Sequence, residues 1–358
     1  MRWNYNNYGE EATNMVKAGI IGATGYAGVE LIRLLAGHGK AKLHKIASVS
    51  FTGKSISEIY PSYYGMVDDI LCPVEEVIET CDVIFAAVPH GVSQPIAAQC
   101  AEKGKAFIDI GADFRLESEE AYETWYGGTF ENKELHKKAV YGLPEFNRED
   151  IRKTKIVANP GCYPTSIALG LYPALKNDLV NKQGIIIDSK SGSTGAGRGL
   201  SQGTHFVDLN EGFHPYKIGA HRHTPEIEQT LSKMAGETMH VTFVPHLLPV
   251  NRGIVSTIYC KKATSQSLAD IHQLYCEFYK EETFVKVLPL GQFSDIRGVR
   301  LSNNCHISIH EDAHTGMLIV VSAIDNMVKG AAGQAIQNMN ILFDFAEAQG
   351  LDTIPPAI

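Results

Sequence analysis

Hydrophobic positions in the first part of the chain form short apolar runs separated by amphipathic stretches. Strand-like runs cover residues 16–21, 43–49, 83–88 and 107–110. Helix-like patterns lie between them, at residues 26–36, 77–80 and 93–103. Strands that alternate with helices predict an α/β fold with a Rossmann-type, doubly wound parallel sheet.

The rest of the chain is richer in β-like runs, at residues 184–189, 241–244, 254–261, 305–310 and 317–323. The clearest helix among them spans residues 268–280. This pattern predicts a second, α+β domain with a mixed or antiparallel sheet. A final helix over residues 326–346 carries four small residues, Gly330 to Gly333, that allow close approach to another backbone.

These patterns predict a division into two domains. We expect residues 15–160 and 326–358 to form the domain with the doubly wound sheet, and residues 161–325 to form the second domain. Residues 1–14 are polar and aromatic, without an apolar signal-peptide core, and are interpreted as a tail.

Composition narrows the possible partners. The 358 residues are 44% hydrophobic and 20% charged, with a net charge of −8, which argues against nucleic acid or an anionic membrane as the main partner. No apolar run reaches the roughly 18 residues that span a bilayer. The seven cysteines are scattered and form no Cys-x-x-Cys pair, so a reducing cytoplasm is the expected compartment.

A glycine-rich loop reading GATGYAG follows the first strand-like run and opens the first helix. The pyrophosphate of a dinucleotide binds at this place in a doubly wound fold. The spacing Gly-x-x-Gly-x-x-Gly is a variant of the usual motif, and a tight turn without a ligand is the alternative. The residues expected at the cofactor are Gly22, Thr24, Gly25, Tyr26, Ala27 and Gly28.

The end of the second strand-like run bears on the choice of cofactor. No Asp or Glu stands there to accept a ribose 2′-hydroxyl, whereas Ser50 and Lys54 suit a 2′-phosphate. We therefore expect NADP rather than NAD, with a solvated surface lysine as the alternative interpretation of Lys54.

Cys162 lies between an apolar run and a helix-like run, in the stretch ANPGCYPT. A thiol at a helix N-terminus meets unpaired N–H groups and a partial positive charge, both of which favour the thiolate. The sequence therefore favours Cys162 as a nucleophile over a small buried hydrophobic residue.

Two histidines are candidates for proton handling. Thr224 is expected to cap a helix that has Pro225 as its first residue. His221 and His223 would then lie on an extended segment and point the same way, so that geometry does not separate them. Simple packing is the alternative for either histidine, and a metal-binding pair lacks a carboxylate or cysteine at ligand spacing.

Three arginines are candidates for anion recognition. Arg115 follows the strand at residues 107–110, Arg198 lies in a glycine-rich loop, and Arg252 precedes a strand. A guanidinium can hold phosphate or carboxylate through two hydrogen bonds. The backbone of residues 191–197 could add an anion-binding nest, and a surface ion pair is the alternative for each arginine.

The chain resembles the N-acetyl-gamma-glutamyl-phosphate reductases from about Val16 to its C-terminus. The resemblance is carried by the glycine loop, by ANPGCYPT, and by the stretches SKSGSTGAGR, HRHTPEI, HLLPVNRG and NMVKGAAGQ. It implies reduction of N-acetyl-L-glutamyl 5-phosphate by NADPH in arginine biosynthesis, through a thioester on a cysteine. It also implies an architecture like that of aspartate-semialdehyde dehydrogenase and glyceraldehyde-3-phosphate dehydrogenase. In that architecture residues 15–160 and 326–358 would form the NADP-binding domain, and residues 161–325 would form the catalytic, substrate-binding and dimerisation domain.

The resemblance adds to the expected site. It favours His221 over His223 and is consistent with a phosphate-binding arginine near Arg115. Ser191 is expected at the substrate, and the remaining cofactor contacts are expected from Pro89, Gly192 and Asn326. The expected partners are a small acyl phosphate and further copies of the chain, as a dimer or tetramer.

Two other functions fit the same residues. One is an acyl-phosphate reductase that acts on aspartyl phosphate. The other is a non-catalytic NADP-binding regulator, in which Cys162 would have no chemical role.

Overall fold

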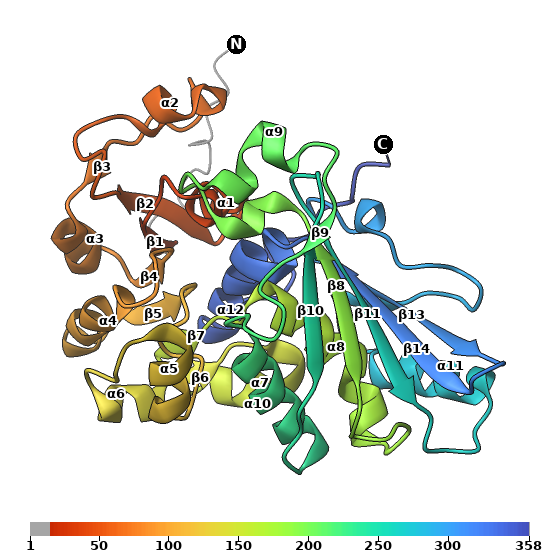
Figure 1. Cartoon of the computed structure of the whole chain (residues 1–358). Coiled ribbons are helices and arrows are strands. Elements are labelled where there is room, and N and C mark those ends of the chain that lie inside the picture. Colours follow the sequence, from red (N-terminus) through yellow and green to blue (C-terminus); the bar gives the residue numbers. More distant parts are fainter. Residues whose placement is uncertain (1–14, 358) are drawn as a thin grey trace. The chain divides into compact units, whose positions relative to one another are not determined.

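The computed structural model describes residues 15–357, so the predicted tail at residues 1–14 lies outside the described part of the chain. The described residues form two compact units (Figure 1). The first unit combines the residues up to Glu123 with Gly127–Pro160 and Ala332–Asp352. The second unit combines Thr124–Tyr126, Gly161–Ala331 and the residues from Thr353 onward.

The first unit contains a parallel sheet in the order β3-β2-β1-β4-β5-β7-β6. Its strands are β1 (Val16–Ile21), β2 (Ala41–Ala47), β3 (Leu71–Cys72), β4 (Val83–Ala86), β5 (Ala106–Asp109), β6 (Val140–Tyr141) and β7 (Ile156–Ala158). This confirms the predicted doubly wound sheet. The strand order reverses at β1 and β4, which is where such sheets bind ligands.

The helices of the first unit include those predicted at residues 26–36, 77–80 and 93–103, which alternate with strands as expected. They are α1 (Tyr26–Leu35), α2 (Ile56–Ile59), α3 (Val74–Thr80), α4 (Ser93–Glu102), α5 (Glu119–Tyr126), α6 (Lys133–Lys138), α7 (Pro144–Ile151) and α12 (Gly333–Leu342). The last three residues of α5 belong to the second unit. The apolar face of α1 buries Leu31, Ile32 and Leu35 against the unit's core.

The second unit contains a mixed sheet in the order β12-β13-β14-β11-β8-β10-β9. Its strands are β8 (Ile186–Ser191), β9 (His214–Pro215), β10 (Thr242–Leu247), β11 (Ile254–Lys261), β12 (Val285–Val287), β13 (Cys305–Asp312) and β14 (Met317–Ile324). The pairs β8–β10 and β12–β13 are parallel, and the other pairs are antiparallel. The predicted α+β domain with a mixed sheet is confirmed.

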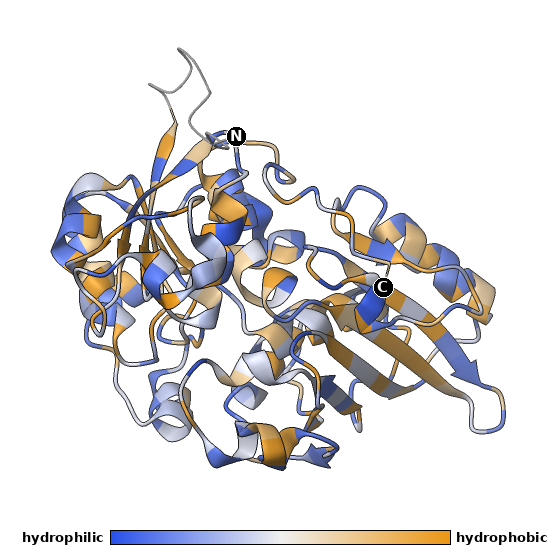
Figure 2. Cartoon of the chain, turned by 90° about the horizontal axis from the view of Figure 1, so that it is seen from above, coloured by the Kyte–Doolittle hydropathy of each residue, from blue (hydrophilic) through white to orange (hydrophobic). Residues whose placement is uncertain are grey.

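Four α-helices accompany this sheet: α8 (Cys162–Lys176), α9 (Phe206–Leu209), α10 (Thr224–Ala235) and α11 (Leu268–Phe278). Strand β11 shows why the strands pack against α8: Ile254, Ile258 and Cys260 alternate with less buried residues and face the core. Hydrophobic residues run along the strands of both sheets (Figure 2).

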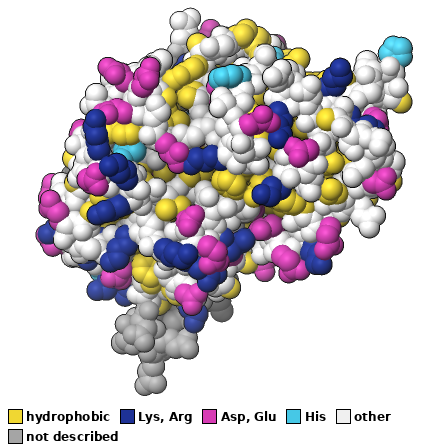
Figure 3. Space-filling view, turned by 90° about the horizontal axis from the view of Figure 1, so that it is seen from below, with side chains coloured by type: hydrophobic (Ala, Val, Ile, Leu, Met, Phe, Trp, Pro, Cys, Tyr) yellow, Lys and Arg dark blue, Asp and Glu magenta, His cyan; other side chains and the backbone are white. Residues whose placement is uncertain are grey.

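The predicted final helix begins differently from the expectation. Val328–Ala332 forms a π-helical turn, and the α-helix proper, α12, starts at Gly333 and ends at Leu342. On the face drawn in Figure 3, Lys and Arg side chains are interspersed with Asp and Glu. Within residues 15–357, no helix combines the length and the apolar character that a membrane span requires.

Candidate active site

The strand-to-helix connection after β7 places Cys162 as the first residue of α8. Gly161 is the N-cap, with φ −68° and ψ 154°, and its carbonyl accepts hydrogen bonds from the N–H and the hydroxyl of Thr165 at 3.0 and 2.9 Å. The prediction that Cys162 lies at a helix N-terminus is therefore confirmed. The first-turn N–H groups of α8 and its dipole favour an anion at this position.

Exposure distinguishes Cys162 from most of the other cysteines. Cys162 is half-buried, whereas burial raises the pKa of Cys81 to about 11 and that of Cys100 and Cys260 to about 12. A buried thiol with such a pKa is unreactive near neutral pH. Cys276 is also half-buried, but it lies within α11 rather than at a helix N-terminus.

Glu226 fixes the turn that presents Cys162. This residue lies in the first turn of α10, is fully buried, and accepts the N–H of Gly161 through its carboxylate at 2.8 Å. A charge-assisted hydrogen bond in a buried place is among the stronger kinds. Glu226 was not singled out from the sequence, although it belongs to the HRHTPEI stretch.

The two histidines lie on a turn, and the prediction of an extended segment is wrong. His223 has helical dihedral angles, φ −78° and ψ −11°, and is itself the N-cap of α10, so that Thr224 is the first helical residue rather than the cap. The turn nevertheless brings the two rings together, with His221 and His223 centroids 4.9 Å apart. A local hydrogen bond explains the turn, because the N–H of His223 donates to Nδ1 of His221 at 3.1 Å.

His221 is held in an aromatic surrounding. The rings of Tyr163, Tyr216 and Phe243 each stand edge-on to its ring at 5.5 Å between centroids. Burial, together with the charges of His223, Lys217 and Arg222, lowers the pKa of His221 to about 2. His221 is therefore neutral near pH 7, with its proton on Nε2 because Nδ1 accepts the backbone hydrogen bond.

Tyr163 links this histidine to the nucleophile, since it follows Cys162 in the chain. Its hydroxyl lies 3.0 Å from that of Tyr216. Burial raises the pKa of both phenols, to about 12 for Tyr216, and the nearby charge of a Cys162 thiolate adds to both shifts. The sequence did not point to either tyrosine, because their contacts with each other and with His221 form only when the chain folds.

A second set of predicted residues meets in three loops, which follow β8, precede β11 and follow β14. The N–H of Gly192 donates to Gly253 O at 2.9 Å, and a Cβ on Gly192 would come within 2.7 Å of the Asn251 backbone. Asn326 ties the same loops together: its Oδ1 accepts the N–H of Gly253 at 2.7 Å, and its Nδ2 donates to Thr194 Oγ1 at 3.0 Å. Only glycine fits the close approach at position 192.

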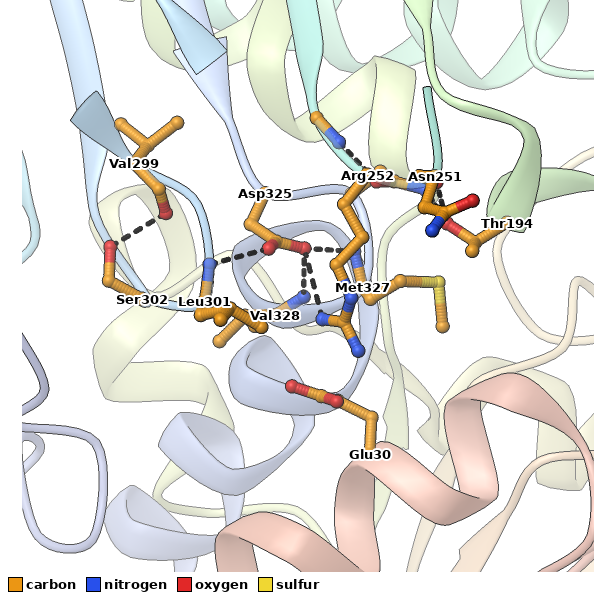
Figure 4. A network of polar contacts seen from close by, with 12 residues as sticks. Glu30, Thr194, Asn251, Arg252, Val299, Leu301, Ser302, Asp325, Met327 and Val328 are labelled. Atoms are coloured by element: carbon orange, nitrogen blue, oxygen red, sulfur yellow. Dashed lines mark hydrogen bonds and ion pairs between the residues drawn. The ribbon is translucent and has the colours of Figure 1, made fainter. Parts of the chain in front are cut away.

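Arg252 lies at the same place and pairs with a buried carboxylate. Its Nη1 is 3.6 Å from Oδ1 of Asp325, which is fully buried (Figure 4). Ser191 is buried, and its hydroxyl group donates a hydrogen bond to Gly192 O at 2.9 Å. Arg198 is exposed in the loop that follows. The structure thus brings Ser191, Gly192, Arg252 and Asn326 together in one network of polar contacts. Arg198 lies outside this network, on the exposed part of the loop that follows β8.

The glycine loop in the first unit has the geometry that a pyrophosphate requires. Gly22 has φ +85°, and a Cβ there would come within 2.2 Å of Ala87 O. A Cβ on Gly28 would lie 2.4 Å from Gly22 O, so α1 begins directly against the loop. No side chain caps α1, whose N-cap is Gly25, and its first turn carries no acidic residue. The loop and Tyr26 and Ala27 therefore fit an anionic dinucleotide.

Three further contacts, which the sequence did not reveal, hold this loop and the beginning of α1. The hydroxyls of Thr24 and Ser48 lie 2.8 Å apart, which joins the loop to the end of β2. Tyr60 donates to Thr24 O at 2.9 Å, and Tyr63 donates to Val29 O at 2.7 Å. The loop is thus tied to the segment that follows β2.

The residues expected at the 2′-phosphate follow β2 on the surface. Ser50 and Lys54 are both exposed, and the ammonium group of Lys54 lies 6.0 Å from the ring centroid of Phe51. No carboxylate within the described residues forms an ion pair with Lys54, which leaves its charge available to an anion. Pro89 is exposed after the end of β4.

Arg115 occupies a more enclosed position than a surface anion ligand. It is 7% exposed, and its guanidinium donates to the carbonyls of Asn159 and Ile110, each at 2.8 Å. The N–H of Asn159 in turn donates to Asp109 O at 2.8 Å. Arg115 therefore holds the backbone three residues before Cys162.

The alternative of a metal site at the His-x-His pair concerns the side chains around it. Across residues 15–357, no three His, Cys, Asp or Glu side chains converge as ligands of a metal ion.

Comparison with known proteins identifies the family. Residues 17–154 match the NAD binding domain of semialdehyde dehydrogenase, and residues 162–326 match its dimerisation domain. The chain is 58% identical over 343 residues to an N-acetyl-gamma-glutamyl-phosphate reductase of Clostridium beijerinckii, covering 96% of this chain and 100% of the relative. The chain belongs to the N-acetyl-gamma-glutamyl-phosphate reductase family. A relative of the same name from Brachyspira hyodysenteriae is 55% identical over 351 residues, with the same coverage of both chains.

Solved structures support the fold of this reductase family member. Aspartate semialdehyde dehydrogenase II of Vibrio cholerae superposes with a TM-score of 0.71 at 17% identity, covering 92% of this chain and 98% of the other. The aspartate semialdehyde dehydrogenase of Candida albicans, solved with NADP, has a TM-score of 0.70 at 20% identity, with the same coverage. The architecture expected from the sequence is thereby confirmed.

Proposed function

We propose that this reductase converts N-acetyl-L-glutamyl 5-phosphate to N-acetyl-L-glutamate 5-semialdehyde and phosphate with NADPH, in arginine biosynthesis. The observation that carries the proposal is the half-buried Cys162 at the first position of α8, with His221 beside the adjoining Tyr163. Relatives that are 55% and 58% identical over almost the whole chain carry the corresponding name.

The first step forms a thioester. The Cys162 thiolate attacks the acyl carbonyl carbon, the C–S bond forms, and the bond to the phosphate oxygen breaks with release of phosphate. First-turn N–H groups of α8 stabilise the oxyanion of the tetrahedral intermediate. Glu226 contributes by keeping the N-cap Gly161 in place through its 2.8 Å hydrogen bond.

NADPH, when bound, supplies the hydride that reduces the thioester. The resulting thiohemiacetal oxyanion then collapses, which releases the aldehyde and restores the thiolate. A neutral His221 with its proton on Nε2 suits stabilisation of the thiolate and the oxyanion by a hydrogen bond, rather than an imidazolium ion pair. His223 remains the alternative residue for proton handling.

The fit of the first unit supports NADP as the cofactor. The glycine loop and the start of α1 would hold the pyrophosphate, and Ser50 and Lys54 would contact the 2′-phosphate. The further cofactor residues we propose are Pro89, Gly192 and Asn326. For the substrate anions we propose Arg198 and Arg252 together with Ser191, with Arg115 supporting the nucleophile loop.

We also propose that the enzyme is a homo-oligomer, a dimer or tetramer. The match of residues 162–326 to a dimerisation domain supports this assembly. The seven cysteines, all of which are free thiols in this structure, fit a reducing cytoplasm.

Turnover of two acyl phosphates tests the proposal. We expect a much larger kcat/KM with N-acetylglutamyl phosphate than with aspartyl phosphate, and loss of turnover with retained NADPH binding in Cys162→Ser. Faster reduction of aspartyl phosphate would show that aspartyl phosphate, and not N-acetylglutamyl phosphate, is the substrate. Cys162→Ser with unchanged turnover would exclude Cys162 as the nucleophile, and wild-type protein that binds NADPH without reducing either substrate would favour a regulator.

A further inference from the structure

The connection between β14 and α12 contains a π-helical turn, Val328–Ala332. The N–H of Gly330 donates to Asp325 O, five residues earlier, at 3.0 Å. A π-turn is uncommon and occurs frequently at functional sites. The contacts of this turn therefore bear on its function.

Gly330 packs directly against the first residue of α8. A Cβ on Gly330 would lie 2.7 Å from Cβ of Cys162 and 3.2 Å from its Cα. Carbon atoms that are not bonded do not approach to 2.7 Å, so even alanine would displace Cys162 or the turn. Gly330 is not among the glycines with positive φ, and the requirement for glycine is therefore one of space.

Asp325, which precedes the turn, anchors its beginning (Figure 4). Its Oδ1 accepts the N–H groups of Met327 at 2.8 Å and Val328 at 3.2 Å, and its Oδ2 accepts the N–H of Leu301 at 2.7 Å. Arg252 compensates the charge at 3.6 Å. A buried carboxylate with these partners holds the turn in one position.

Lys329 strengthens the anchoring. It is fully buried, and its ammonium group lies 5.6 Å from the ring centroid of Phe284, within the second unit. The residue before Gly330 is thus also fixed. Because Met327, Val328 and Lys329 are held in this way, the part of the turn that leads into Gly330 resists a shift away from Cys162.

We propose that the π-turn anchored by Asp325 is a positioning device for the nucleophile, with Gly330 as the residue that sets where the Cys162 side chain stands. The inference rests on the proposed role of Cys162 as the nucleophile. Displacement of the thiol would move it away from the first-turn N–H groups that favour the thiolate. A misplacement of about 1 Å at a reacting atom costs on the order of 10²-fold in rate.

The variant Gly330→Ala tests the proposal, measured by alkylation of Cys162 with iodoacetamide in the free enzyme and quantified on the peptide that contains Cys162. We expect alkylation at pH 7 to slow at least about threefold, with the pH profile shifted to higher pH. In turnover we expect kcat to fall about tenfold or more with a small change in KM.

Gly170→Ala is the matched control. Gly170 lies in α8, the helix that begins with Cys162. A Cβ on Gly170 would lie 3.2 Å from Ile258 Cδ1 and 3.2 Å from Ser322 Cβ, away from Cys162. This variant should lose thermal stability and keep the wild-type alkylation profile. If Gly330→Ala lowers the melting temperature but leaves alkylation unchanged, as Gly170→Ala is expected to do, the positioning role is excluded.

A second variant covers the case in which Gly330→Ala does not fold. Asp325→Asn keeps the size of the side chain and weakens the anchoring of the turn, so we expect the alkylation profile to shift in the same direction. An unchanged profile would overturn the proposal. Because alkylation needs no substrate, these outcomes are independent of which acyl phosphate the enzyme reduces.

Discussion

The backbone N–H of His223 donates a hydrogen bond to Nδ1 of His221 at 3.1 Å. This contact places the proton of a neutral His221 on Nε2, and the surrounding burial and positive charges lower the pKa of the imidazole to about 2. His221 can therefore donate a hydrogen bond at neutral pH without being charged.

Substitution of His221 separates hydrogen bonding from proton transfer. Glutamine can place an amide N–H near the position of Nε2, whereas alanine removes the donor. We expect His221→Ala to lower kcat by about 10²- to 10³-fold, the usual loss of an oxyanion donor, and His221→Gln to keep clearly more activity. Equal loss in both variants, or an acidic limb near pH 6.5 that His221→Gln abolishes, would instead indicate proton transfer by this residue.

Loss of the Glu226 carboxylate should destabilise the nucleophile loop. Glu226→Ala leaves the N–H of Gly161 without its buried acceptor, which costs about 1–3 kcal/mol of unfolding free energy, and we expect kcat to fall with it. Glu226→Gln retains a hydrogen-bond acceptor, so its unfolding free energy and its kcat should lie between those of Glu226→Ala and the wild type. Urea unfolding and turnover are the two measurements.

Glu228→Ala serves as the control for Glu226→Ala. Glu228 lies in the same helix and accepts the N–H of Val241 at 3.1 Å, away from Cys162. We expect unchanged kcat for Glu228→Ala. A kcat for Glu226→Ala that equals the wild-type value would show that the Gly161 contact has no part in catalysis.

Lys54→Ala tests the choice of cofactor. Loss of one charge-assisted contact to a 2′-phosphate should raise the Kd for NADPH about tenfold and leave the Kd for NADH nearly unchanged. Lys40→Ala is a suitable control, because Lys40 is also exposed but precedes β2 rather than following it. Calorimetric titration measures the Kd for each nucleotide. An equal increase in the Kd values for NADPH and NADH would argue against the 2′-phosphate contact.

Asp109 should make stability depend on pH. Burial, reinforced by the charge of Asp113, raises the pKa of Asp109 from 3.8 to about 7 in the folded protein. Between these two values the folded state keeps a proton that the unfolded chain loses, so the contribution of Asp109 to stability falls as pH rises and levels off above about 7. Between pH 5 and pH 8, the free energy of unfolding of Asp109→Asn should therefore rise by about 2.6 kcal/mol relative to that of the wild type.

Chemical unfolding at several pH values measures this effect. The exposed Asp352→Asn, in the same unit, should follow the wild-type curve. If the difference between Asp109→Asn and the wild type stays constant from pH 5 to 8, the carboxyl group does not titrate in this range.

Long apolar runs made much of the fold predictable. The first strand, Val16–Ile21, and the strand Ile254–Lys261 are found with the bounds that their patterns predict, because most of their side chains are buried or half-buried. The second strand lies two residues earlier than predicted, at Ala41–Ala47, since Val49 is apolar but 89% exposed. Strands of two residues, such as Leu71–Cys72, are too short to leave a pattern.

The site was predictable as far as local motifs carry it. The stretch ANPGCYPT indicated the helix terminus at Cys162, and the small residues from Gly330 to Gly333 indicated a close backbone contact. Neither pattern revealed that Gly330 meets Cys162 itself, or that Glu226 holds Gly161. These contacts join residues that are 168 and 65 positions apart in the chain, and only tertiary packing creates them.

Trapping the acyl-enzyme tests the central claim most directly. Wild-type enzyme mixed with N-acetylglutamyl phosphate in the absence of NADPH should gain the mass of one N-acetylglutamyl group per chain. Peptide mass spectrometry should locate this group on Cys162, and Cys162→Ser should show no such thioester. An adduct on another residue, or full turnover by Cys162→Ser, would contradict the account.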